Sequence, residues 1–296
     1  GGKTILDVFN NRFENDQVLC NMKRNYSAPE NFKISFSDEE ISKVDYVLLF
    51  LGENAYAESP GNIDNLNLDN NQIDLAKRAT DLGKKIILVL VEGRPRIISD
   101  FSDNMDGIIN AFLPGSMGAQ AIVDVLFGDC NPSGTLPFTY PANPGDLLCY
   151  DHKNLSAMVR TAPNKRKYGG YHPEFEFGHG LSYSEFAISE LILSTDTLQK
   201  NKELKISFIV KNNGSMDGTK NIDLFVKDHY ASLAPDVKNL KNFTKVFLKA
   251  GEEKEVVFEV DKNDLFFYNK NGKELLEEGD FTILIEDKSR SFYFKN

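Results

Sequence analysis

The order of apolar and polar residues in the first part of the chain predicts strands that alternate with helices. Nearly continuous apolar runs of strand length, typical of buried strands, occupy residues 44–51 and 85–91, and residues 106–113 are expected to form a third strand. Strands separated by helices are typical of parallel βαβ units, so we expect a mostly parallel sheet with flanking helices, an α/β sandwich. The amphipathic segments that we expect to form the helices are residues 4–13, 69–85 and 118–129, with a shorter helix at 96–103.

Residues with capping chemistry mark the ends of two of these helices. Thr4 and Asp69 stand where an N-cap is expected, because their side-chain oxygens can accept a hydrogen bond from the first turn. Gly83 suits the stop of the second helix, since it takes a positive φ at no steric cost.

From about residue 186 the apolar period changes to two. This alternation, with Asn-Gly and similar turns between the runs, predicts an antiparallel, fibronectin III-like β-sandwich of about 100 residues. We therefore predict two domains: residues 1–181, which are loop-rich after 130, and residues 182–296. The alternating positions that we expect in the core are Leu204, Ile206, Phe208 and Val210, then Ile222, Leu224 and Val226, then Val256, Phe258 and Val260, then Phe281, Ile283 and Ile285.

Composition and charge narrow the classes of partner. The net charge of −10 and the lack of a basic stripe argue against nucleic acid, and no apolar run approaches the roughly 20 residues of a membrane span. The three cysteines, Cys20, Cys130 and Cys149, form no CxxC pair, so we expect neither a disulfide framework nor a zinc site. The four histidines show no ligand spacing, and we expect no metal and no cofactor. The start has neither Met nor a signal peptide, so we expect a fragment or a processed chain and read no compartment from it.

Each predicted strand is followed by a loop with residues that suit a binding site. These loops are residues 52–62, 92–95 and 114–118. The carboxyl ends of parallel strands meet at one edge of a sheet, where α/β folds bind ligands. Glu53 and Glu58 lie in the first loop, and a carboxyl group at such an edge can act as a general acid. A solvated charge is the simpler interpretation of either glutamate taken alone.

The loop PGSMG offers a competing hypothesis. It lies between a strand and a helix, as the nucleophile elbow of a serine hydrolase does, and Ser116 would be the nucleophile. The first glycine of that pattern is replaced by Pro114, and we interpret the loop as a tight strand-to-helix turn.

Taken in order, several motifs resemble glycoside hydrolase family 3, the β-glucosidase and β-xylosidase family. They are GENAYAESPGNI, LVEGRPR, AFLPGSMGAQAIVDVLFGDCNPSGTLPFTYP and FEFGHGLSYSEF, followed by segments that resemble the family's C-terminal fibronectin type III-like domain. The resemblance implies a retaining mechanism with two carboxylates. It places the general acid/base on Glu58, and it implies that Glu53, Tyr56 and Asn62 support the loop or bind substrate. Gly61 matches the same loop motif, and Asn62 stands where aspartate is more usual.

The resemblance also implies what this chain would need. The nucleophilic aspartate would lie on a (β/α)8 barrel whose motif is absent here, so we expect the C-terminal portion of an exo-acting β-glycosidase, inactive as an isolated chain. The substrate would be a β-glycoside or oligosaccharide, β-glucosides before β-xylosides, and the resemblance implies a secreted or periplasmic protein. The alternative is a non-catalytic carbohydrate-binding or assembly module that has lost its barrel.

Overall fold

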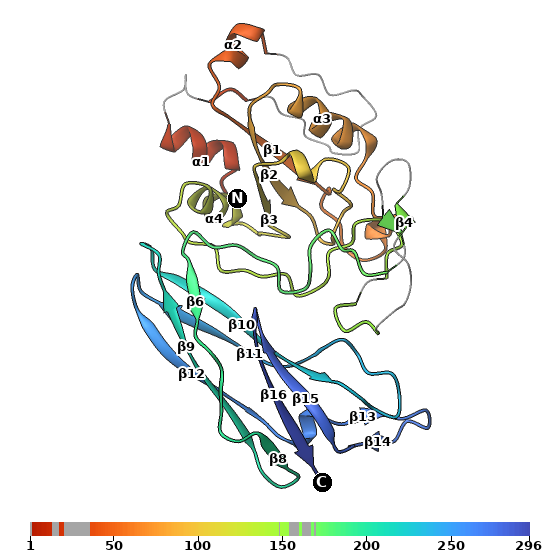
Figure 1. Cartoon of the computed structure of the whole chain (residues 1–296). Coiled ribbons are helices and arrows are strands. Elements are labelled where there is room, and N and C mark those ends of the chain that lie inside the picture. The colour runs from red at the N-terminus through yellow and green to blue at the C-terminus, as the bar shows by residue number, and fades with distance from the viewer. Residues whose placement is uncertain are drawn as a thin grey trace. The chain divides into compact units, whose positions relative to one another are not determined.

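A computed structural model of the chain describes residues 2–13, 18–20, 36–147, 149–153, 160–161, 167–168 and 170–296 (Figure 1). It divides into two compact units. The first comprises Gly1–Cys130 and Pro141–Leu147, and the second comprises Asn131–Tyr140 and Leu148–Asn296. The predicted domain boundary between residues 181 and 182 stays a prediction.

The first unit contains a parallel sheet in the order β1-β2-β3, as the apolar runs predict. Leu88, Val89 and Leu90 at its centre are fully buried, which explains why the run is apolar on both faces. In Figure 1 helices α1 and α4 lie on one side of this sheet and α3 on the other. The strands are β1 (Tyr46–Gly52), β2 (Lys85–Val91) and β3 (Gly107–Asn110), and the helices are α1 (Ile5–Arg12), α2 (Asp38–Ser42), α3 (Asn70–Thr80) and α4 (Gly118–Leu126).

The observed helices agree only in part with the caps and the helix positions predicted from the sequence. Thr4 caps α1 in a capping box with Asp7, each side chain accepting the other residue's backbone N–H. Asp69 occupies the N-cap of α3, but its side chain makes no capping hydrogen bond. The predicted short helix at 96–103 is wrong. Ile97 bridges Asn67 as extended chain and donates to the Leu66 carbonyl at 2.9 Å, which leaves only the 3₁₀ turn Ser102–Asn104.

The second unit is a β-sandwich built from two sheets, in the strand orders β11-β10-β15-β16-β8 and β12-β9-β6, with β7 also pairing β9. Every alternating apolar position predicted from the sequence lies in its core, so that prediction is confirmed. The strands are β6 (Phe186–Ile188), β7 (Ile192–Leu193), β8 (Thr197–Gln199), β9 (Leu204–Asn212), β10 (Gly218–Asp228), β11 (Asn239–Leu248), β12 (Glu253–Val260), β15 (Gly279–Ile285) and β16 (Lys288–Lys295). Shorter elements are β4 (Arg160–Thr161), β5 (Lys167–Tyr168), β13 (Phe267–Tyr268), β14 (Glu274–Leu275), and the 3₁₀ turns η1 (Ser59–Gly61) and η3 (Lys262–Asp264).

Candidate active site

The loop that carries both candidate glutamates begins where β1 is tied to its neighbours. Gly52 has φ +153°, and a Cβ there would lie 1.9 Å from the Val91 carbonyl oxygen, so only glycine fits. Glu53 continues the pairing, because its N–H donates to that carbonyl at 2.9 Å. The buried side chain of Gln72 accepts from the Gly52 N–H at 2.8 Å and donates to the Gly52 carbonyl at 2.9 Å. The start of the loop is therefore fixed to both β2 and α3.

Glu53 is the centre of a charged network at this edge of the sheet. Its side chain is only 9% exposed and faces two guanidinium groups, Arg96 Nη1 at 2.9 Å and Arg94 Nε at 3.3 Å. Its other oxygen accepts from the Gly93 N–H at 3.0 Å and from the Tyr56 hydroxyl at 3.2 Å. A carboxylate held by two cations and two neutral donors is a structural anchor, since all its lone pairs are directed at fixed partners.

Tyr56 is held from several sides. The Arg94 guanidinium lies 4.4 Å above its ring centroid, and Arg94 Nε donates to its hydroxyl at 3.1 Å. A Cβ on Gly61 would lie 2.3 Å from the ring, and one on Gly93 would lie 2.2 Å from the hydroxyl. Both glycines are therefore required by the close packing of this ring.

Glu58 has surroundings opposite to those of Glu53. It is exposed, and within the described residues its carboxylate makes no hydrogen bond or ion pair. Its backbone has φ 52° and ψ −137°, a conformation that L residues rarely adopt, and its carbonyl accepts from the Gly61 N–H at 2.9 Å. Asn62 is also exposed, and its N–H donates to the Ser59 carbonyl at 3.0 Å to close the turn. The structure thus brings Glu53 and Tyr56 together and leaves Glu58 and Asn62 exposed on the same loop.

Sequence reasoning missed the two arginines and the glutamine that hold this loop. Arg96 is 8% exposed, and its Nη2 also donates to the Asn67 carbonyl. The sequence carries part of the signal, because Arg94 lies in the loop at 92–95 at the predicted site edge, but it does not show which residue Arg94 contacts. Gln72 gave no signal, since a polar residue on an amphipathic helix is expected to be exposed.

The loops after β2 and β3 are tied to each other. The N–H of Glu92, a fully buried residue, donates to the Phe112 carbonyl at 3.1 Å. Asn110 Nδ2 donates to Glu92 Oε1 at 3.4 Å, and Asn110 Oδ1 accepts from the Phe112 N–H at 3.1 Å. Ser116 is exposed in the third loop, and its hydroxyl makes no hydrogen bond within the described ranges. No histidine belongs to the unit that carries Ser116, so the arrangement gives the serine-hydrolase hypothesis no support.

The described part of the chain has no candidate metal site, no helix that could span a membrane and no paired cysteines. The residues described there contain no group of three His, Cys, Asp or Glu side chains placed to hold a metal ion. No described helix has the length and apolar character needed to cross a membrane. Cys20, Cys130 and Cys149 are exposed free thiols.

Comparison with known proteins shows to which protein family the chain is similar. The glycosyl hydrolase family 3 C-terminal domain matches residues 2–183, and the fibronectin type III-like domain matches residues 222–289. The chain is 34% identical over 250 residues to the periplasmic beta-glucosidase of Salmonella typhimurium, covering 82% of this chain and 33% of that protein. It is 33% identical over 265 residues to the lysosomal beta glucosidase of Dictyostelium discoideum, covering 85% of this chain and 31% of that protein.

A solved structure of a beta-glucosidase is also similar to this chain, in agreement with the family match. The beta-glucosidase of Listeria innocua in complex with glucose is similar with a TM-score of 0.78 and 30% identity, over 88% of this chain and 38% of that one. The chain therefore spans about a third of the length of the relatives that it matches. The chain belongs to glycoside hydrolase family 3, of which it carries the C-terminal α/β sandwich domain and the fibronectin type III-like domain.

Proposed function

We propose that this chain supplies Glu58 as the general acid/base of a retaining, exo-acting β-glycosidase, with a β-glucoside as the preferred substrate. The observation that carries the proposal is the contrast within one loop. Four partners fix Glu53 at the start of the loop, whereas Glu58 is exposed near its far end. An acid/base must reach a substrate that another part of the enzyme holds, so its loop needs a rigid base and an accessible carboxyl group.

The proposed chemistry needs a second carboxylate. Retaining glycosidases use two carboxyl groups about 5–5.5 Å apart, one as nucleophile and one as acid/base. Glu58 would protonate the leaving oxygen in the first step and deprotonate a water molecule in the second. The nucleophile would be an aspartate on a (β/α)8 barrel, which the family resemblance assigns to a part of the enzyme outside these residues.

Related proteins support the choice of substrate. Curated relatives carry the names beta-glucosidase and beta-xylosidase, and the similar solved structures include the beta-glucosidase of Listeria innocua in complex with glucose. Two relatives are named as periplasmic and lysosomal, and we propose a secreted or periplasmic location for this protein, which cell fractionation with an antibody to the chain would test.

The role of Glu58 is tested by Glu58→Ala in the enzyme reconstituted with a family 3 barrel. Substrates with poor leaving groups should lose about 10²–10⁴-fold in kcat/KM, whereas activated aryl glycosides, which need little protonation, should lose far less in the glycosylation step. Azide should restore turnover and yield a glycosyl azide of retained configuration. Asp64→Ala, which removes a carboxylate beyond the loop, is the control. Equal losses on both substrate types without an azide effect would reject the role and favour the non-catalytic carbohydrate-binding alternative.

A further inference from the structure

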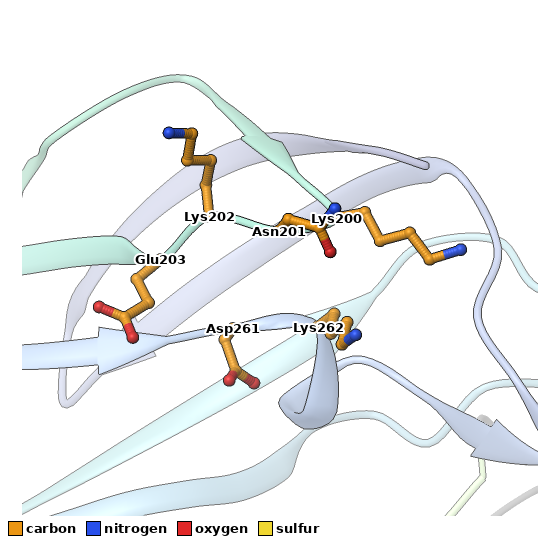
Figure 2. A pocket seen from close by; sticks show the side chains of 6 residues that line it. All are labelled: Lys200, Asn201, Lys202, Glu203, Asp261 and Lys262. Carbon is orange, nitrogen blue, oxygen red and sulfur yellow. The ribbon is translucent and has the colours of Figure 1, made fainter.

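Among the described residues of the β-sandwich unit, two depressions have volumes that could hold a ligand. The first, of about 410 Å³, lies where the turn between β8 and β9 meets η3 (Figure 2). Figure 2 shows the side chains of Lys200 and Lys202 pointing away from each other into open space. All residues that line this first depression are polar or charged, so it offers a ligand little apolar surface to bury. The lining residues are Lys200, Asn201, Lys202, Glu203, Asp261 and Lys262.

The second depression, of about 370 Å³, has both aromatic and charged residues in its lining and is called the β10–β13 cavity here. It is formed by the end of β10, the loop at 231–236, the start of β11 and the segment that leads into β13. Figure 1 shows β13 and β14 beside the loop that joins β10 to β11. Its volume falls in the range of small-molecule sites.

Part of the lining of the β10–β13 cavity is aromatic. Phe266, Phe267 and Tyr268 line it in succession, and the rings of Phe266 and Tyr268 meet edge to face with centroids 5.5 Å apart. Tyr268 is 59% exposed, and its hydroxyl donates to Glu274 Oε1 at 3.2 Å, which orients the ring. Leu233, which also lines the cavity, is exposed as well. These side chains form apolar surface that water covers in the free protein.

The lining of the β10–β13 cavity also carries half-buried charges, among them Asp228 and Lys241. Burial raises the pKa of Asp228 above its ordinary value, and one of its oxygens accepts from the Tyr230 N–H at 3.1 Å. Burial also lowers the pKa of Lys241, against the opposing effect of Asp264 and Asp236. Among the described residues the Lys241 ammonium makes no hydrogen bond or ion pair, so its three donors are available to a ligand.

We propose that the β10–β13 cavity binds a neutral sugar ring of an oligosaccharide, at a second site beyond the proposed catalytic one. A sugar ring has an apolar C–H face that can lie on Tyr268, and its hydroxyl groups can accept from Lys241 and donate to Asp228. An anion would meet the carboxylates of the lining, and a cation would meet Lys241, so a neutral polar ligand leaves the least unpaired charge. Such a site would hold a chain of the substrate near the enzyme and raise its local concentration.

Titration calorimetry of the 296-residue chain tests the proposal, with cellotetraose, laminaritetraose and xylotetraose as probes. At least one should bind saturably, with a Kd on the order of 1 mM. Tyr268→Ala and Lys241→Met should each weaken that binding at least about tenfold, because the first removes the aromatic platform and the second removes the ammonium while keeping the apolar stem. Tyr293→Ala, which truncates an exposed tyrosine on β16, is the matched control and should change nothing.

Several outcomes would overturn the proposal. These are no binding by any of the three sugars, binding that both cavity variants leave intact, and binding of glycylglycine or inorganic phosphate in place of sugar. Binding that Glu58→Gln abolishes would also contradict it, because the ligand would then lie at the catalytic loop. Thermal unfolding of each variant verifies the fold. The assay measures binding without turnover, so its failure is distinguishable from a failure of the proposed role of Glu58.

Discussion

At the residue scale, Glu53 and Glu58 show how position decides what a carboxylate does. Both belong to one loop, five residues apart, with the same side chain. Glu53 is 9% exposed and has four partners, whereas Glu58 is exposed and has no side-chain partner among the described residues. The first is held in place by its partners, and the second is exposed, as its proposed role as general acid/base requires.

Glu53→Gln should strongly destabilise the first unit. The change removes the negative charge that faces Arg96, whose side chain is 10% exposed, so a guanidinium would remain in a poorly solvated position. We expect a loss of about 3 kcal/mol in the free energy of unfolding, measured by urea denaturation. Glu39→Gln, which breaks an exposed pair with Lys43, is the control and should have little effect. Equal effects of the two substitutions would show that the network does not stabilise the unit.

The strained backbone at Glu58 should appear as a difference in stability between the glycine and alanine variants at this position. At φ 52° and ψ −137° glycine is favoured over alanine, so Glu58→Gly should unfold at a higher temperature than Glu58→Ala, by about 1 kcal/mol in stability. The order should reverse at Asp74, an exposed residue within α3, where glycine costs about 1 kcal/mol relative to alanine. The same order at both positions in differential scanning calorimetry would argue against strain at Glu58.

At the element scale, hydrogen bonds and side-chain packing hold together the three loops at the carboxyl edge of the parallel sheet. Gly52 and Gln72 fix the start of the first loop, and Arg94 of the second loop lies over Tyr56 of the first. Gly93 and Gly61 leave the space that the tyrosine ring fills. The position of Glu58 therefore depends on residues of α3 and of the loop after β2 as well as on its own loop.

Gly61→Ala should disturb this arrangement without touching a charged group. The new Cβ would lie 2.3 Å from the Tyr56 ring, so the ring or the turn must move, at a cost of about 1–3 kcal/mol. In the reconstituted enzyme we expect kcat for poor leaving groups to fall with little change in KM, since the displaced turn carries Glu58. Gly134→Ala is the control, because nothing lies within 4 Å of its Cβ. Wild-type stability and kcat in Gly61→Ala would contradict the packing that we describe.

At the scale of the whole molecule, this chain corresponds to about a third of its relatives. A lone general acid contributes typically 10²–10⁴-fold to a rate, far less than a glycosidase provides. Residues 1–296 alone should therefore leave aryl β-glucosides and β-xylosides unhydrolysed above background, and addition of a matching barrel should give activity that depends on Glu58. Activity of the chain alone that Glu58→Ala abolishes would mean that a second carboxylate of the site lies within it.

The sequence by itself determined the parallel strands, the period-two core of the sandwich, the Thr4 cap and the family motifs. These features depend on local periodicity and on neighbours three or four residues apart, which a sequence shows directly. Tertiary structure alone decided which residues hold the candidate site. The contacts of Glu53 with Gly93 and Arg96 join residues 40 and 43 positions apart, and Gln72 reaches Gly52 across 20. Likewise, Ile97 is extended because it pairs with residues near 67, although its own sequence favours a helix. Side chains distant in sequence meet only where the fold brings them together, so no local pattern can specify them.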